Sequence, residues 1–126
     1  MTTSLQLAHD KLRCDIRPDL GGCIAGLWLG QTPVLRSTPA PTLQSVRLSG
    51  SYPLVPFSNR VGHATLLWAG TSHPLVQSAA EPHAIHGVGW QRPWEVLDAS
   101  DQFARLSYER KPNAAWPLAF DCSQAF

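Results

Sequence analysis

Prolines and glycines interrupt this chain at short intervals, and their spacing limits the secondary structure that it can form. The 126 residues include 11 prolines and 9 glycines, spread along the whole sequence. Proline breaks the interior of a helix because it lacks an N–H and clashes with the preceding turn, and glycine is also unfavourable there. Long helices are therefore disfavoured, and short strands joined by turns are expected instead.

Short alternating runs agree with this expectation. Lys11 to Ile16 alternates polar and apolar residues, as a half-buried strand does, and Ala104, Leu106 and Tyr108 share one face of a later run. Only residues 41–48 are typical of a short helix. We predict an all-β fold, an antiparallel β-sandwich that forms a single domain over residues 1–126. The strands are expected at residues 11–16, 23–29, 34–36, 65–68, 94–97 and 103–109, the last two as a hairpin.

Composition and charge exclude several classes of function. Hydrophobic residues make up 44% of the chain and charged residues 15%, which is typical of a globular protein. The net charge is +1 without a basic run, so we expect no nucleic-acid partner. No apolar stretch approaches the roughly 20 residues of a membrane span. Cys14, Cys23 and Cys122 lack CxxC spacing, and we interpret them as reduced thiols of a cytoplasmic protein.

Two short segments combine an arginine, a histidine and a tryptophan with residues that control backbone shape. The first is Ser58-Asn59-Arg60, and the second runs from Ala84 to Trp90 and contains His86 between Ile85 and the glycines Gly87 and Gly89. Glycine lets the backbone turn tightly and lie close to a ligand. Arginine offers a planar fork of donors, and histidine donates or accepts near neutral pH. Together these groups favour a small, ring-shaped ligand with many hydroxyls.

The order and spacing of these segments resemble the aldose 1-epimerase (galactose mutarotase) family. The similarity is carried by Pro56-Phe57-Ser58-Asn59-Arg60-Val61, Leu66-Leu67-Trp68-Ala69-Gly70, the stretch from His83 to Val96, and the opening segments Gly21 to Leu27 and Pro33 to Arg36. It covers nearly the whole chain. The resemblance implies a large β-sandwich, the galactose mutarotase-like supersandwich, which agrees with the strand pattern. It also implies an isomerase that interconverts the α and β anomers of an aldohexose and needs no cofactor.

The resemblance also implies which residues contact the sugar. Ring opening at C1 needs one group that takes the proton from the C1 hydroxyl and another that protonates the ring oxygen. In the family these are a glutamate and a histidine, both expected downstream of this chain, so no catalytic residue is assigned within it. Arg60 matches the family's substrate-binding arginine, and His86 its first active-site histidine. Asn59 and Trp90 complete the predicted substrate-binding set.

Each of these residues has a structural alternative. Arg60 is alternatively a strand-end surface arginine, and His86 a histidine that caps a loop. Asn59 alternatively fixes the local turn through its side chain, and Trp90 packs in the core rather than against a sugar. A zinc site at His83 and His86 is disfavoured, because two residues three apart in a strand point to opposite faces. We therefore predict no metal.

The C-terminal end of the sequence carries another alternating run. Phe120, Cys122, Gln124 and Phe126 fall on one side of it, and the sequence stops within the run. Because a strand that ends a domain in this way leaves an unpaired edge, we expect an N-terminal portion of an epimerase that is truncated and self-associates through that edge. Without the downstream residues it would be inactive. The alternative is a catalytically inactive, carbohydrate-binding or oligomer-forming β-sandwich module.

Overall fold

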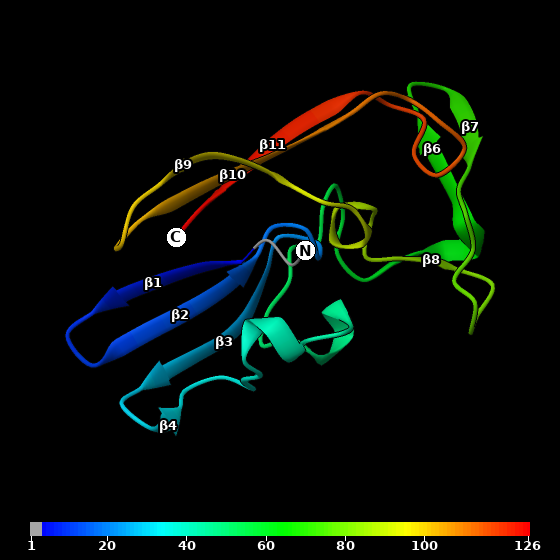
Figure 1. Cartoon of the computed structure of the whole chain (residues 1–126). Helices are drawn as coiled ribbons and strands as arrows, with labels where there is room; N and C mark the ends of the chain where they lie inside the picture. Colours follow the sequence, from blue (N-terminus) through cyan, green and yellow to red (C-terminus); the bar gives the residue numbers. More distant parts are fainter. Residues whose placement is uncertain (1–3) are drawn as a thin grey trace.

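A computed structural model describes residues 4–126 as two facing antiparallel sheets with smaller two-stranded ladders at one end (Figure 1). The first sheet has the order β1 (Leu5–His9), β2 (Leu12–Arg17), β3 (Cys23–Leu29) and β4 (Thr32–Pro33). The second sheet has the order β11 (Phe120–Ala125), β10 (Ala104–Arg110) and β9 (Glu95–Ala99). The ladders are β5 (Arg60–Val61) with β8 (Ala84–Ile85), and β6 (Thr65–Trp68) with β7 (Thr71–Pro74). The predicted all-β, antiparallel architecture is confirmed.

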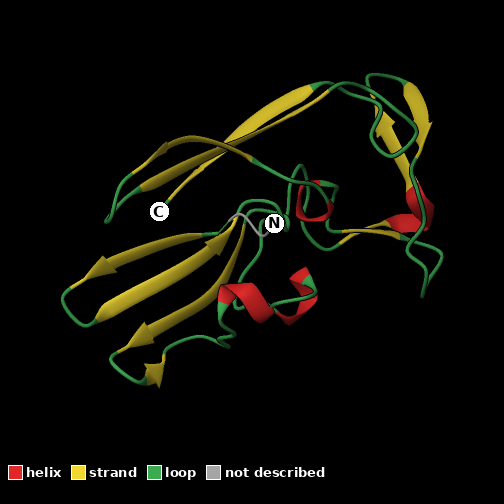
Figure 2. Cartoon of the chain, viewed as in Figure 1, coloured by secondary structure: helices red, strands yellow, loops and turns green. Residues whose placement is uncertain are grey.

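The helical segments are all short 3-10 turns between strands (Figure 2). They are η1 (Ala40–Thr42), η2 (Val46–Leu48), η3 (Gly62–Ala64) and η4 (Gly89–Gln91). The short helix predicted within residues 41–48 is therefore a pair of 3-10 turns, and Pro41 lies inside the first of them. Within residues 4–126, no helix is long and apolar enough to cross a membrane.

The strand predicted at residues 34–36 is wrong, because β3 pairs instead with residues 32 and 33. The Ser37 hydroxyl accepts from the Leu27 N–H at 2.9 Å and donates to the Leu27 carbonyl at 3.1 Å. The Val34 N–H also donates to the Leu27 carbonyl at 2.8 Å, and the chain bends at residues 34–36 before Ser37 returns to Leu27. Elsewhere the predicted strands agree with the structure, and residues 23–29 and 65–68 have the predicted bounds.

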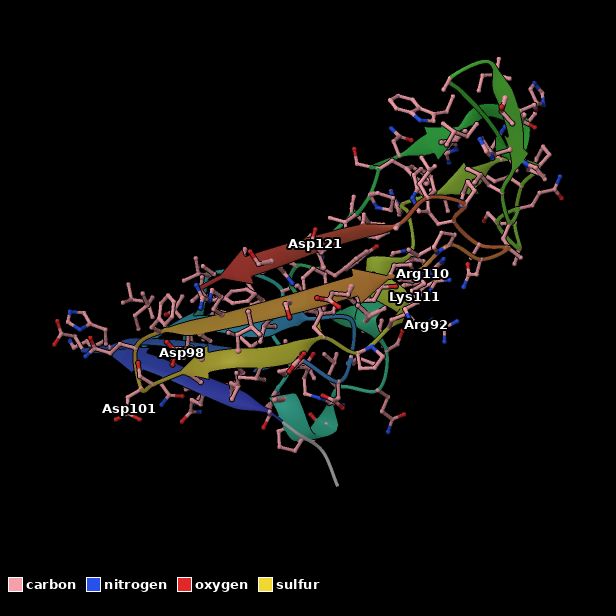
Figure 3. The ribbon with its side chains drawn as sticks, turned by 90° about the horizontal axis from the view of Figure 1, so that it is seen from above. Arg92, Asp98, Asp101, Arg110, Lys111 and Asp121 are labelled. Atoms are coloured by element: carbon pink, nitrogen blue, oxygen red, sulfur yellow. The ribbon has the colours of Figure 1, made fainter. Side chains whose placement is uncertain are left out.

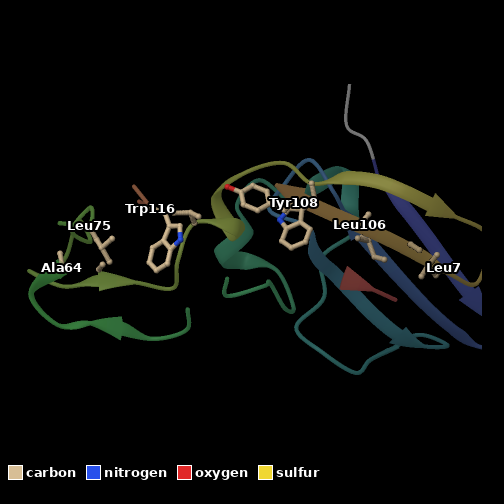
Figure 4. Close-up of a cluster of buried hydrophobic side chains, with 11 residues drawn as sticks. Leu7, Ala64, Leu75, Leu106, Tyr108 and Trp116 are labelled. Carbon is tan, nitrogen blue, oxygen red and sulfur yellow. The ribbon is translucent and has the colours of Figure 1, made fainter. Parts of the chain in front are cut away.

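The two sheets face each other across a hydrophobic cluster (Figure 4). Leu7 and Ile16 come from the first sheet, and Ala104, Leu106 and Tyr108 from the second. Ile16 and Leu106 have no exposed surface, whereas the outward side of β10 is exposed at Arg105 and Glu109. The face predicted from the alternation in β10 is therefore confirmed. The cluster continues to Ala64, Leu75 and Trp116 at the other end of the molecule.

A second cluster lies between the first sheet and the 3-10 turns, and a buried arginine holds the two together. Arg17 is 7% exposed and donates to both carboxylate oxygens of Asp19 at 2.7 Å. It also donates to the carbonyls of Ala40 at 2.7 Å and Leu43 at 3.0 Å. The hydrogen bond from Arg17 is the main reason that the pKa of Asp19 lies below its usual value. The side chains that pack in this cluster are Cys23, Ala25, Ala40, Leu43, Val46 and Trp90.

The inward face of β11 is half-buried rather than open to solvent. Phe120, Cys122 and Phe126 pack against the first cluster, and the Phe120 ring lies 5.7 Å from the Tyr108 ring. The Gln124 amide donates to the Gly22 carbonyl at 3.2 Å. The apolar residues at this end are therefore partly covered by other parts of the chain. In residues 4–126, β11 is an edge strand, and self-association through it stays a prediction.

Candidate functional site

The short ladder between β5 and β8 brings two distant segments side by side. Arg60 pairs with Ile85, and Val61 pairs with Ala84. The ladder is extended by Asn59 and His86, which bond to each other twice. The His86 N–H donates to the Asn59 carbonyl at 2.8 Å, and the Asn59 N–H donates to His86 Nδ1 at 3.1 Å. Asn59 and His86 are thereby held at the same edge of the ladder as Arg60.

The bond from Asn59 determines which nitrogen of the His86 ring can donate. Because Nδ1 accepts a hydrogen bond, it carries no proton in the neutral ring, and the ring proton lies on Nε2. Both residues adopt left-handed backbone angles, with φ 63° at Asn59 and 64° at His86. Asparagine and histidine are among the residues that tolerate this conformation best. The half-buried His86 ring therefore offers an Nε2–H donor in a defined orientation.

Arg60 is held by two neighbours. Its Nε and Nη2 donate to the two carboxylate oxygens of Glu81, with Nη2 and Oε2 3.0 Å apart, and its Nη1 donates to Asn59 Oδ1 at 3.0 Å. The Arg60 side chain remains 50% exposed, and the Glu81 side chain is 25% exposed. The hydrogen bond from Arg60 holds the pKa of Glu81 below its usual value, so Glu81 is an ionised carboxylate at neutral pH. The site thus combines an oriented arginine with a paired negative charge.

Glu81 is the residue of this site that sequence reasoning missed. It lies in the polar, irregular segment from Ser78 to His83, which carries no periodicity and no motif. The contact joins residues 21 positions apart, and it depends on how this loop returns toward β5. No local sequence pattern could have revealed it.

The nearby histidines take structural roles. The Nδ1 atom of His83 accepts from the His63 N–H at 2.8 Å, and the two rings meet edge to face at 5.2 Å. Among the residues described, no group of three or more His, Cys, Asp or Glu side chains is placed to hold a metal ion. The chemistry available at this edge of the ladder is therefore hydrogen-bond donation by Arg60 and His86.

The loop after His86 is tied to the segment around Val55. The Val55 carbonyl accepts from Val88 N–H at 2.8 Å and from Gly89 N–H at 3.1 Å. Gly87 has φ 65°, and a Cβ at this position would overlap the Val55 carbonyl. Only glycine combines that backbone angle with such a close approach. The glycine predicted from sequence to allow a tight turn is therefore required by the backbone beside His86.

Trp90 lies beneath this loop rather than on the surface with Arg60. It is 7% exposed, packs 5.7 Å from the Tyr52 ring, and is covered by the Arg47 guanidinium at 5.1 Å. It lines a cavity of about 310 Å³ together with Arg47, Gln77, Ser78, Gly87 and Val88. Its contact with a sugar therefore stays a prediction, and its packing role is visible in the structure. Trp94 is likewise buried and donates from Nε1 to the Gly89 carbonyl at 2.9 Å.

Charged side chains of both signs lie along the second sheet and its flanking loops, where Arg105 pairs with Asp98 and Glu109 with Asp121. Asp98 and Asp101 lie at one end, whereas Arg92, Arg110 and Lys111 lie at the other (Figure 3). Arg92 comes just before β9, and by sequence alone it is the candidate for the extra basic group that a sugar phosphate would need. It belongs to a different element from the β5–β8 ladder, and the charged partner of Arg60 is Glu81.

Comparison with known proteins relates this geometry to one family. A family model described as aldose 1-epimerase matches residues 3–126. The uncharacterized protein YphB of Escherichia coli (strain K12) is 34% identical over 125 residues, which are 98% of this chain and 41% of that protein. This chain therefore spans about two fifths of the length of the relative that it matches.

Solved structures show the same fold. The crystal structure of a putative aldose 1-epimerase from Escherichia coli K12 matches with a TM-score of 0.85 and 32% identity, over 100% of this chain and 42% of that one. A GalM/aldose epimerase homologue from C. elegans matches with a TM-score of 0.80 and 17% identity, over 99% and 41%. Galactose 1-epimerase from Lactobacillus acidophilus NCFM matches with a TM-score of 0.74 and 15% identity, over 97% and 39%. Residues 4–126 thus adopt part of a galactose mutarotase-like β-sandwich.

Proposed function

The chain belongs to the aldose 1-epimerase family, and on that premise we propose that it supplies the sugar-binding part of an enzyme that interconverts the anomers of an aldohexose. The observation that carries this proposal is the pair of hydrogen bonds between Asn59 and His86, which lie beside Arg60. It presents an Nε2–H donor and a guanidinium at one edge of a short ladder. Hydroxyl and ring oxygens of a sugar are matching acceptors.

Each proposed contact has a defined role. Arg60 and His86 donate hydrogen bonds to sugar oxygens, and Arg60 stabilises the negative charge that develops as the ring opens. Asn59 orients Arg60 and His86 rather than contacting the sugar. Its oxygens accept hydrogen bonds from Arg60 and from the His86 backbone, and its N–H donates to the His86 ring. Trp90 supports the loop from below, where a sugar that reached the cavity would also meet its ring.

Ring opening itself requires groups beyond these donors. A base must take the proton from the C1 hydroxyl while an acid protonates the ring oxygen, and each contributes about 10²–10⁴-fold in rate. Glu81 is unsuited to be the base, because its carboxylate is occupied by Arg60 and its pKa is lowered by that hydrogen bond. The family resemblance assigns the base and acid to a glutamate and a histidine outside residues 1–126.

We expect D-galactose and D-glucose to bind residues 1–126 weakly at the edge of the β5–β8 ladder. In a titration followed by ¹H–¹⁵N NMR, the signals of Asn59, Arg60 and His86 should shift in a saturable manner. Arg60→Met should weaken binding by about tenfold or more, because a hydrogen bond from a charged donor contributes about 1.5–3 kcal/mol. The matched control is Arg105→Met, since Arg105 is exposed on the outward side of β10 and should leave binding unchanged. Equal binding by both variants would contradict the proposed role of Arg60.

We expect no measurable acceleration of mutarotation by residues 1–126 alone. The reason is that the donors at Arg60 and His86 hold a sugar without moving a proton at C1. Polarimetry on freshly dissolved α-D-glucose or α-D-galactose checks this, with an active mutarotase as the positive control. A clear, enzyme-dependent rate would show that this chain contains an acid and a base of its own.

A further inference from the structure

We infer that Glu81 is a positioning residue for Arg60 and that it makes the site prefer uncharged sugars over anionic ones. This inference rests on the proposed function, in which Arg60 contacts the sugar. It goes beyond that function because it assigns a role to a loop residue and names the charge class of the ligand.

Glu81 takes one complete edge of the Arg60 guanidinium. The contact is bidentate, from Nε to Oε1 and from Nη2 to Oε2 at 3.0 Å. Asn59 Oδ1 accepts from the third nitrogen, Nη1, at 3.0 Å. A guanidinium held at all three nitrogens by two residues has a fixed plane, and its remaining Nη N–H groups point in fixed directions. Glu81 thereby pre-organises the donors that a sugar oxygen would meet.

The same contact occupies the Nε–Nη2 fork, one of the two forks through which the guanidinium could hold an anionic ligand, and Asn59 takes one donor of Nη1 beside the other. Carboxylates and phosphates pair with arginine through two parallel N–H···O bonds, which is the geometry that Glu81 already forms. A ligand carboxylate would have to displace Glu81 or approach its negative charge. The remaining single N–H groups suit a hydroxyl or ring oxygen, which carries no full charge. Glu81 thus favours neutral sugars both through geometry and through charge.

Other charges near Arg60 do not replace Glu81. His83 and His86 are the other ionisable side chains that act on the Glu81 carboxylate. His83 is occupied by the His63 backbone, and His86 accepts from Asn59 through Nδ1. In this cluster the negative charge of Glu81 balances the positive charge of Arg60. Removing that carboxylate leaves a positive site.

The test compares D-galactose with D-galacturonate, which share the same ring and differ by a carboxylate at C6. NMR titrations of the parent chain and Glu81→Gln measure the ratio of the two dissociation constants. We expect Glu81→Gln to shift this ratio toward galacturonate by about tenfold. Galactose binding should weaken by roughly fivefold, and the reduced repulsion of the anion should account for the rest. Glu81→Asp keeps the charge and should retain most of the parent preference. The Glu109→Gln variant is the matched control, since Glu109 is exposed on the outward side of β10 and undergoes the same chemical change.

A second readout requires no ligand. In the parent chain the Arg60 Nε–H should give a distinct, slowly exchanging ¹⁵N signal, and Glu81→Ala should broaden or remove it while other signals stay in place. A purely structural role of Glu81 would change stability but not the ratio of the two sugars. An unchanged ratio in Glu81→Gln would overturn the inference, whereas the absence of sugar binding by the parent would overturn the proposed function as well. If Glu81→Ala fails to fold, Glu81→Gln and Glu81→Asp decide the result.

Discussion

Replacing Gly87 with alanine is expected to lower the free energy of unfolding by about 2–4 kcal/mol and to abolish the sugar response of Arg60 and His86. Gly87 has φ 65°, which costs an L-residue about 1–2 kcal/mol, and the added Cβ would overlap the Val55 carbonyl. That carbonyl accepts from both Val88 and Gly89, so moving it also displaces the loop that follows His86. Urea denaturation and the NMR titration measure the two effects.

The matched control is Gly62→Ala. Gly62 belongs to the 3-10 turn after β5, and a Cβ built there meets no atom within 4 Å. This variant should change stability by less than about 0.5 kcal/mol and leave sugar binding intact. If Gly87→Ala were as stable as Gly62→Ala and bound galactose equally well, the close approach of Gly87 to Val55 would have no part in forming the site.

Replacing Arg17 with methionine is expected to destabilise the fold by about 2–4 kcal/mol. Methionine is of similar length but cannot donate, so the carbonyls of Ala40 and Leu43 lose their partners and Asp19 loses its counter-charge. Arg17 is 7% exposed, which limits the water that could replace these bonds. Because the same cluster contains Trp90, the loop that carries His86 should also become more mobile on a hydrogen-exchange timescale.

The denaturation midpoint of Arg17→Met should be compared with that of Arg105→Met. Arg105 is exposed on β10, and the same chemical change there should stay within about 0.5 kcal/mol of the parent. Equal stability of the two variants would mean that the hydrogen bonds of Arg17 are replaced without cost. The second cluster would then be held by apolar packing alone.

The sequence predicted those strands that show an alternation of polar and apolar residues or are bounded by turn residues. The alternation of Ala104, Leu106 and Tyr108 identifies the buried face of β10 without knowledge of its neighbours. The run from Cys23 to Leu29 is bounded by turn residues on both sides and has the predicted bounds. Neither β1 nor β4 was predicted, because β1 is established by its pairing with β2 and β4 by its pairing with Trp28 and Leu29.

In the candidate site, too, local motifs revealed some residues, whereas others depend on contacts between distant segments. The sequence placed Arg60 and His86 in one site through the order of two motifs. In the structure Arg60 begins β5, and His86 directly follows the paired strand β8. The sequence could not place Glu81, since the contact depends on the return of an irregular loop. It also left open whether Trp90 packs or binds, because a tryptophan that follows a Gly-Val-Gly segment suits both roles. The packing becomes visible only with Tyr52 and Arg47 in place.

A crystal structure of this chain with bound D-galactose would test the central claim most directly. We expect a sugar oxygen within hydrogen-bond distance, about 2.7–3.2 Å, of an Nη atom of Arg60 and another near His86 Nε2. The Asn59–His86 and Arg60–Glu81 contacts should remain in place. A sugar bound instead in the cavity beside Arg47 and Trp90, with no contact to Arg60 or His86, would contradict it.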